Sequence, residues 1–365
     1  MAAALDGLLV ADFSRVLAGP LVGQTLGDLG ADVVKVESPE GDDTRRWGPP
    51  FDERGGATYF NAANRNKRSL VLDLRRDADR AAARNLCDGA DVVVANFRPG
   101  TLERFGLDHA SVVDANPRVV YCEITGFGEA GGRDMPGYDP LVQALGGLMS
   151  VTGPPETPSK TGVAIVDVVA GLYATVGVLA ALRERESSGR GQRVTINLMH
   201  TALATLANQA TGYLATGDVP ARLGNDHPSI APFSTYRAAD GDLMIGVGNE
   251  RQFTSFCGAI GAEALAADAR FAHNAARVRH ASELREAIER QLAARTCAEW
   301  TERLLAAGVP AGPVLDVAEA FALAARLGLD VVDEVGGVRT VGFPATLSRT
   351  PASTRRPPPG LGDAT

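Results

Sequence analysis

Short apolar runs alternate with longer amphipathic stretches over the first half of the chain. The run GLLVADFS (7–14) predicts a buried strand. The next stretch, AGPLVGQTLGDLGA (18–31), predicts a helix with Pro20 in its first turn and Gly30 at its end. Further strands are predicted in DVVKVE (32–37), RSLVLDL (68–74), DVVVANF (91–97) and RVVYCEITGFG (118–128), with helical stretches such as DADRAAARNLCDGA (77–90) between several of them. Such alternation indicates an α/β fold with a doubly wound parallel sheet, whose ligands bind at the carboxyl ends of the strands.

The longest apolar segment contains a single acidic residue. The stretch KTGVAIVDVVAGLYATVGVLAAL (160–182) has one charged residue after Lys160, Asp167. We predict a helix from Asp167 to about Glu186, then a strand in VTINL (194–198) and helical structure over 198–217. Because the segment is rich in glycine and is interrupted by a carboxylate, the pattern favours a buried helix over a membrane span.

The pattern of predicted elements changes after about residue 222. The stretch 224–248 predicts loops and a β-hairpin, and the segments 253–261, 282–296 and 297–308 predict short helices. A strand and a proline-rich tail follow over 335–365. We therefore predict a large Rossmann-like domain over 1–220, completed by 330–365, and a smaller α+β domain over 221–329.

Composition and charge exclude several classes of protein. Apolar residues make up 45% of the 365 positions and charged residues 22%, which is typical of a globular protein. The four cysteines, Cys87, Cys122, Cys257 and Cys297, have no metal-ligand spacing and fit core positions in a reducing cytoplasm. The histidines have no zinc-site spacing, so no metal is expected, and the absence of GxSxG disfavours an α/β-hydrolase. The net charge of −8 argues against a nucleic-acid partner, and no signal peptide is recognised, so we expect a cytoplasmic location and no membrane partner.

The beginning of the chain partly matches a dinucleotide-binding pattern. A strand, a turn with glycine and a helix precede a strand that ends in Glu37, where a ribose-binding acid is expected. The turn SRVLAGPLVG (14–23) has no GxGxxG, which disfavours a nicotinamide site. Basic residues near the predicted strand ends are either solvated surface charges or ligands of a diphosphate or 3′-phosphate, and both readings stay open. They are Arg15, Lys67, Arg68, Arg98 and Arg104.

Two roles are open for Asp167. At the start of a helix its carboxylate can accept backbone N–H bonds, which is a purely structural role. A desolvated carboxylate at a helix N-terminus is also a reactive nucleophile. The two roles are compatible, because helix N–H groups can hold the anion without covering it.

Several motifs together resemble one family over nearly the whole chain. They are LDGLLVADFSRVLAGPLVGQTLGDLGADVVKVE (5–37), NRNKRSLVLDL (64–74), ANFRPGTLERFGL (95–107), GYDPLVQALGGLMSVTG (137–153), SGRGQRVTINL (188–198) and PPPGLGDAT (357–365). In these motifs the chain resembles the class III CoA-transferases, the family that contains formyl-CoA and carnitine CoA-transferases and α-methylacyl-CoA racemase.

The resemblance implies a role for each of the matching residues. Asp167 would attack an acyl-CoA thioester to form a mixed anhydride and then an aspartyl-CoA thioester, from which a carboxylic acid takes the CoA. No cofactor beyond the CoA thioester substrate is implied. The expected CoA-binding residues are Val16, Leu17 and Ala18 at the pantetheine, Leu72, Asp73, Leu74 and Arg75 at the adenosine, Asn96, Phe97, Arg98 and Arg104 at the nucleotide and phosphates, and Gly137, Tyr138 and Asp139 at the thioester.

Departures from the family pattern narrow the expected activity. The racemases carry His-Asp where this chain has Tyr138-Asp139, so a transferase is favoured over a racemase or epimerase. Oxalate-specific members carry glutamine where this chain has Leu17, and their run of glycines is absent. The stretches LGNDHPSIAPF (223–233) and GVGNERQF (246–253) resemble members that act on succinyl-CoA and small dicarboxylates. The resemblance also implies an interlocked homodimer. A CoA-binding protein without turnover, in which Asp167 only caps its helix, remains the alternative from another class.

Overall fold

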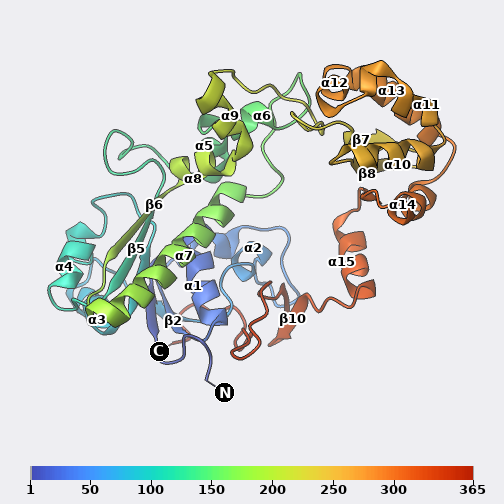
Figure 1. Cartoon of the computed structure of the whole chain (residues 1–365). Helices are drawn as coiled ribbons and strands as arrows, with labels where there is room; N and C mark the ends of the chain where they lie inside the picture. The colour runs from blue at the N-terminus through green and yellow to red at the C-terminus, as the bar shows by residue number, and fades with distance from the viewer. Residues whose placement is uncertain (1, 365) are drawn as a thin grey trace. The chain divides into compact units, whose positions relative to one another are not determined.

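A parallel sheet of six strands forms the centre of the first part of the chain (Figure 1). The computed structural model describes residues 2–364. The strands are β1 (Leu9–Asp12), β2 (Asp32–Glu37), β3 (Lys67–Val71), β4 (Val92–Ala95), β5 (Val120–Thr125) and β6 (Arg193–Asn197), in the spatial order β3-β2-β1-β4-β5-β6. All neighbouring pairs are parallel, which confirms the predicted α/β class. The order reverses between β1 and β4, where ligands of such sheets bind.

Helices cover both faces of this sheet. Val92 and Val94 of β4 pack into the core that contains α1 (Ala18–Asp28) and α7 (Ile165–Ser188). Val93 and Ala95 face the opposite core, with α3 (Asp77–Gly89) and α4 (His109–Val113). The alternation follows from the two-residue period of a strand, and it explains why the strands read as continuous apolar runs.

Helix α7 is the long apolar element that the sequence singles out. By length and composition it could cross a membrane, yet half of its most apolar window is buried within the protein, against α1, β5 and β6. Asp167 is its third residue rather than its first. The helical stretch predicted over 198–217 is two helices, α8 (Leu198–Thr205) and α9 (Asn208–Thr216), because Ala207 between them has a left-handed φ of 46°.

The remaining elements of this part are short. They are η1 (Asp43–Arg46), α2 (Thr58–Asn61), η2 (Glu103–Phe105), α5 (Asp139–Leu145), α6 (Leu148–Val151) and the hairpin β10 (Val332–Val335) to β11 (Val338–Val341). The proline-rich tail after β11 lies along the sheet: Ser353 N–H donates to the Asp28 carbonyl and Ala364 N–H to the Ser69 carbonyl.

The contacts divide the chain into two compact units. One consists of the chain up to Met149, of Lys160–Val219 and of the chain from Asp330 onward; the other is Ser150–Ser159 with Pro220–Leu329. Ser150–Ser159 joins the second unit because the Arg222 guanidinium donates to the carbonyls of Ser150, Pro154 and Pro155. The second unit contains β7 (Phe233–Arg237), β8 (Asp242–Gly246), β9 (Ala311–Pro313), α10 (Glu250–Ile260), α11 (Glu263–Ala267), η3 (Ala269–Phe271), α12 (Asn274–Arg279), α13 (Ala281–Leu292), α14 (Cys297–Ala306) and α15 (Val317–Arg326).

Lys67 and Arg68 do not lie at the ligand-binding edge of the sheet. They begin β3, so they stand at its amino end. The Lys67 side chain is fully buried, and its Nζ donates to Asp12 Oδ2 at 2.8 Å, to the Pro20 carbonyl at 2.8 Å and to Asn64 Oδ1 at 3.0 Å. Arg68 forms an exposed ion pair with Asp32. Of the two readings left open for the basic residues, the phosphate reading therefore does not hold for Lys67 and Arg68.

We expect Lys67→Met to lower the free energy of unfolding by about 3–5 kcal/mol, because it leaves the Asp12 carboxylate buried without its cation. The matched control is Arg68→Met, one position further along the same strand, which removes an exposed pair and should cost less than about 1 kcal/mol. Denaturant unfolding of the three proteins measures both values. Equal costs for the two variants would contradict the interpretation.

Candidate active site

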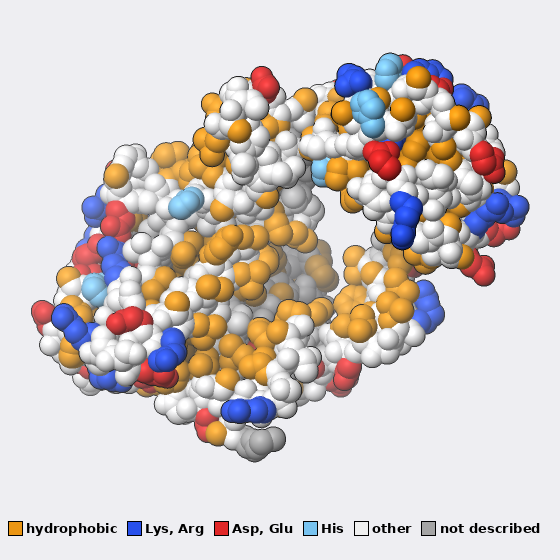
Figure 2. Space-filling model, in the orientation of Figure 1, with side chains coloured by type: hydrophobic (Ala, Val, Ile, Leu, Met, Phe, Trp, Pro, Cys, Tyr) orange, Lys and Arg blue, Asp and Glu red, His pale blue; other side chains and the backbone are white. Residues whose placement is uncertain are grey.

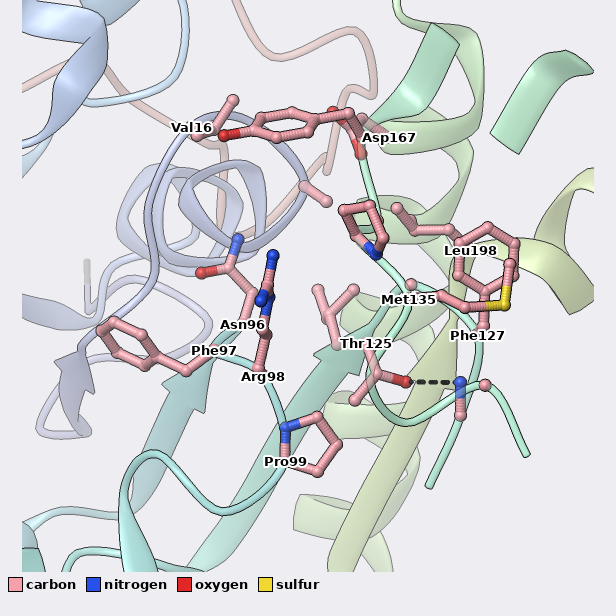
Figure 3. Close-up of a pocket in the computed structure, with 18 of the residues that line it drawn as sticks. Val16, Asn96, Phe97, Arg98, Pro99, Thr125, Phe127, Met135, Asp167 and Leu198 are labelled. Carbon is pink, nitrogen blue, oxygen red and sulfur yellow. Dashed lines mark hydrogen bonds between the residues drawn. The ribbon is translucent and has the colours of Figure 1, made fainter. Parts of the chain in front are cut away.

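A cavity of about 470 Å³ opens at the carboxyl ends of β1, β4 and β5 (Figure 3). Its floor and walls come from the residues that follow these strands and from the start of α7. The lining includes Arg15, Val16, Leu17, Ala18, Asn96, Phe97, Arg98, Thr125, Phe127, Arg133, Met135, Gly137, Tyr138, Asp167 and Leu198. The volume is in the range of small-molecule sites.

A second cavity of about 220 Å³ lies at the carboxyl ends of β2 and β3. Its lining is largely apolar and includes Phe13, Leu72, Asp73, Leu74, Arg75, Phe97 and Phe105. Arg15 and Phe97 line both cavities, and the Arg15 guanidinium carbon lies 5.1 Å from the centre of the Phe97 ring. This stacked pair therefore marks the point where the two cavities meet, at the reversal of the strand order.

Cations gather in the larger cavity. The side chains of Arg98 and Arg133 have no hydrogen bond or ion pair with any of residues 2–364, and Arg15 has only a 3.7 Å pair with Asp43. Guanidinium groups without partners bind phosphate oxygens well, because their planar donors match two oxygens at once. This end of the cavity is suited to a phosphorylated ligand.

The Asp167 carboxylate lies at another part of the same cavity, without a hydrogen-bond partner among the described residues. Only 8% of the residue is exposed. Asp167 does not cap its helix, so the purely structural role weighed from the sequence is wrong. Asp139 fills that role instead: its Oδ2 accepts the backbone N–H groups of Val166 at 2.8 Å and Asp167 at 3.2 Å, and its Oδ1 accepts from Gln143.

Burial, and to a smaller extent the neighbouring Asp139 carboxylate, together raise the pKa of Asp167 from 3.8 to about 7. Desolvation disfavours the charged form, and no described donor compensates it. A carboxylate with a raised pKa in a cavity is a candidate for chemistry rather than for structure.

The structure brings most of the sequence-predicted site residues together. Val16, Leu17, Ala18, Asn96, Phe97, Arg98, Gly137, Tyr138 and Asp167 line the larger cavity, and Leu72, Asp73, Leu74 and Arg75 line the smaller one. Arg104, in η2, and Asp139 line neither. The carboxylate of Glu37 is occupied by Arg45 and Ser69.

Sequence reasoning missed the wall that follows β5. Thr125 is the last residue of β5, Phe127, Arg133 and Met135 belong to the loop between β5 and Gly137, and Leu198 begins α8. The signal was a glycine-rich stretch directly after a predicted strand. A Cβ at Gly126 would lie 2.5 Å from the Gly137 Cα, so the two ends of this loop touch backbone to backbone. The loop has this path only because both positions are glycine.

No group of three His, Cys, Asp or Glu side chains that could hold a metal ion occurs within residues 2–364.

Comparison with known proteins agrees with this geometry. The family model described as CoA-transferase family III matches residues 5–365 of this chain. The chain belongs to CoA-transferase family III. It is 44% identical to the succinate–glutarate CoA-transferase of Agrobacterium fabrum, over 98% of this chain and 93% of the relative. It is 39% identical to the acetyl-CoA:oxalate CoA-transferase of Acetobacter aceti, over 94% and 89%.

Solved structures show the same fold. A CAIB/BAIF family protein from Brucella suis superposes with a TM-score of 0.90 at 42% identity, over 100% of this chain and 98% of that one. The expected family and the expected class of enzyme are confirmed, and the nicotinamide reading of the first strand and turn is not needed. As a member of this family the protein acts as a CoA-transferase.

We expect kcat/KM for CoA transfer to rise with pH through about 7, because the form of Asp167 that can attack is the ionised one and is lost as the pH falls through its raised pKa. Asp139→Asn removes the neighbouring charge but keeps a side-chain oxygen for the helix cap, so it should move the midpoint to lower pH. The pH dependence of kcat/KM measures both effects. Glu186→Gln, exposed at the far end of α7, is the control; a midpoint that Asp139→Asn leaves in place would contradict the assignment.

Proposed function

We propose that the protein transfers CoA from succinyl-CoA to a small carboxylic acid, preferably a dicarboxylic acid, and that Asp167 is its covalent nucleophile. The observation that carries the proposal is the Asp167 carboxylate: buried, without a partner among the described residues, and in one cavity with unpaired arginines. The named activities of the relatives, which include succinate–glutarate and acetyl-CoA:oxalate transfer, support the substrate class.

CoA would lie along the carboxyl edge of the sheet. The apolar smaller cavity, with Leu72, Asp73, Leu74 and Arg75, suits the adenosine. Arg15, Arg98 and Arg133 would hold the phosphates, and Val16, Leu17 and Ala18 would line the path of the pantetheine to Asp167. Asn96 would contact CoA through its own backbone atoms. Its side-chain amide is not available, because it is hydrogen-bonded to both the N–H and the carbonyl of Arg15. Arg104 stays a candidate only for a phosphate that extends beyond the cavities.

The proposed reaction is a relay between acyl groups. An Asp167 oxygen attacks the thioester carbon, the C–S bond breaks, and a mixed anhydride and CoA thiolate result. The thiolate then attacks the Asp167 γ-carbon, an anhydride C–O bond breaks, and the donor leaves as a carboxylate. The acceptor carboxylate attacks the aspartyl-CoA thioester, and the same steps in reverse give the new acyl-CoA and free Asp167. The relay makes each carboxylate reactive in turn, because an anhydride accepts a thiolate and a free carboxylate does not.

The alternatives are less well supported. A racemase needs two bases at the α-carbon of its substrate. Among the described residues, no histidine that could act as one of them lines the larger cavity. Tyr138 stands where racemases of the family carry histidine, and it is 60% exposed. In a CoA-binding protein without turnover, the free-energy cost of burying the unpaired Asp167 carboxylate would serve no function.

We also propose that the enzyme is an interlocked homodimer in the cytoplasm. The outer face of α7 exposes Leu172, Tyr173 and Val176, which are 56%, 52% and 63% exposed. Figure 2 shows hydrophobic side chains gathered over this helix. A second copy of the chain would cover them, since exposed apolar patches mark interfaces. The cysteines are all free and buried, which suits a reducing compartment.

We expect the wild type, but not Asp167→Asn, to form new acyl-CoA species from succinyl-CoA and a mixture of carboxylic acids. Mass spectrometry of the products names the acceptors, and mass spectrometry of the protein detects the CoA adduct on Asp167. Both proteins should still gain thermal stability from CoA, because the substitution leaves the nucleotide cavities intact. Equal CoA exchange by the variant, or no exchange by the wild type with any donor, would contradict the proposal. Washout of the α-proton in heavy water would favour the racemase.

We expect the wild type to have twice the chain mass of 38.1 kDa by light scattering and to keep that mass on dilution to nanomolar concentration. Val176→Glu should instead give aggregated or unfolded protein, because it places a charge in the apolar contact and interlocked subunits do not separate while folded. Arg183→Ala, also exposed on α7, is the control. A folded, active monomer of either protein would disprove the interlocked dimer.

A further inference from the structure

The first turn of α1 presents backbone N–H groups that have no partner. The N–H groups of Leu17 and Ala18 form no hydrogen bond with any of residues 2–364, although Ala18 is only 4% exposed. Both residues line the larger cavity. Buried N–H groups without a partner are rare, and they mark a place where a ligand oxygen is expected.

Side chains occupy most of the backbone groups just before this turn. The Ser14 carbonyl, which Ala18 would use to extend the helix, accepts from Lys35 Nζ at 2.9 Å. Asn96 binds the N–H of Arg15 at 2.8 Å and its carbonyl at 2.7 Å. The Val16 N–H faces the Asp42 carboxylate at 3.3 Å. The next two N–H groups are thus left free while the chain around them is held in place.

Val16 has a conformation that needs such support. Its φ of 71° lies in the left-handed region, which β-branched residues rarely adopt. The structure maintains this strain directly beside the cavity, in the residue that precedes the two free N–H groups. Strained backbone of this kind occurs where the surroundings fix it and often at functional sites.

The unpartnered Asp167 carboxylate lies on the same cavity as these donors. Gly171, one turn further along α7, packs on the start of α1: a Cβ there would lie 2.8 Å from the Ala18 carbonyl oxygen. Residues four apart share a helix face, so Asp167 points along the side of α7 that faces α1. The N–H groups at the start of α7 are already occupied by Asp139. The free N–H groups of Leu17 and Ala18 lie at the start of α1, on the side that this face of α7 packs against, while the N–H groups of Gly137 and Tyr138 also line the cavity without a partner among residues 2–364.

We propose that the N–H groups of Leu17 and Ala18 form the oxyanion hole of the transfer reaction. The inference rests on the proposed function and assigns the donors for its first step. Here an Asp167 oxygen forms a bond to the thioester carbon, and the carbonyl π pair moves onto the carbonyl oxygen. The two N–H groups hold this oxyanion until it collapses and expels the CoA thiolate. No proton or electron leaves the system.

The positive end of the α1 dipole acts in the same direction, since a helix N-terminus favours negative charge. The donors do not reach the resting Asp167 carboxylate, with which they form no hydrogen bond. They consequently stabilise charge that develops on the substrate, which is the property required of a catalytic donor.

The test replaces single amides of the full-length enzyme by esters, through incorporation of α-hydroxy acids. Leucic acid at Leu17 or lactic acid at Ala18 removes one N–H and leaves the side chain unchanged. Removal of one oxyanion donor lowers kcat on the order of 10²–10³-fold, and we expect a fall of that order for both esters, with KM for succinyl-CoA nearly unchanged. Single-turnover formation of the aspartyl-CoA adduct should slow to the same extent.

Glycolic acid at Gly19 is the matched control. The Gly19 N–H also has no partner among the described residues, but Gly19 does not line the cavity, so this ester should keep the wild-type kcat. Wild-type kcat in both the Leu17 and the Ala18 ester would overturn the proposal, as would an equal loss in all three. Absence of exchange in the wild type would instead refute the proposed function itself. Val16→Gly should lower kcat without lowering Tm, an outcome that misfolding cannot produce.

Discussion

Two buried lysines hold the turn between β1 and α1, and the site depends on them. Lys67 binds Asp12 and the Pro20 carbonyl, and Lys35 binds Asp42 and the Ser14 carbonyl. Neither side chain is exposed. Charges in such surroundings persist only when they are paired and fully hydrogen-bonded. The pairing fixes the backbone on both sides of Val16 and so determines where the first turn of α1 faces.

The carboxylates of the site differ in whether donors of the protein bind them. Asp42 and Asp139 have similar chemistry to Asp167, but each is bound to donors of the protein, and burial raises the pKa of Asp167 because no described donor reaches it. The arrangement costs stability at one position and leaves one carboxylate and two amides free for the substrate. Strain and unpaired groups at functional sites are the usual expression of this trade.

The cavity is divided by charge along the edge of the sheet. Unpaired arginines lie at the end near β4, and the Asp167 carboxylate lies where α7 begins. A CoA thioester has the complementary distribution, with anionic phosphates at one end and an electrophilic carbon at the other. The Arg15–Phe97 stack stands between the phosphate-binding part and the apolar cavity suited to adenosine. The position of each group follows from the strand that it terminates.

The sequence by itself determined the strands, the parallel α/β class, the family and the candidacy of Asp167. These are local or motif properties: a two-residue period, a helix with proline in its first turn, a lone acid in an apolar run. Only the tertiary structure decided that Lys67 supports the core instead of a phosphate, that Asp139 rather than Asp167 caps α7, and that Arg133 joins Arg98 in the cavity. Each of these depends on which groups far apart in the chain become partners. Hydrogen bonds and ion pairs between distant residues are set by packing, which no local pattern of residues records.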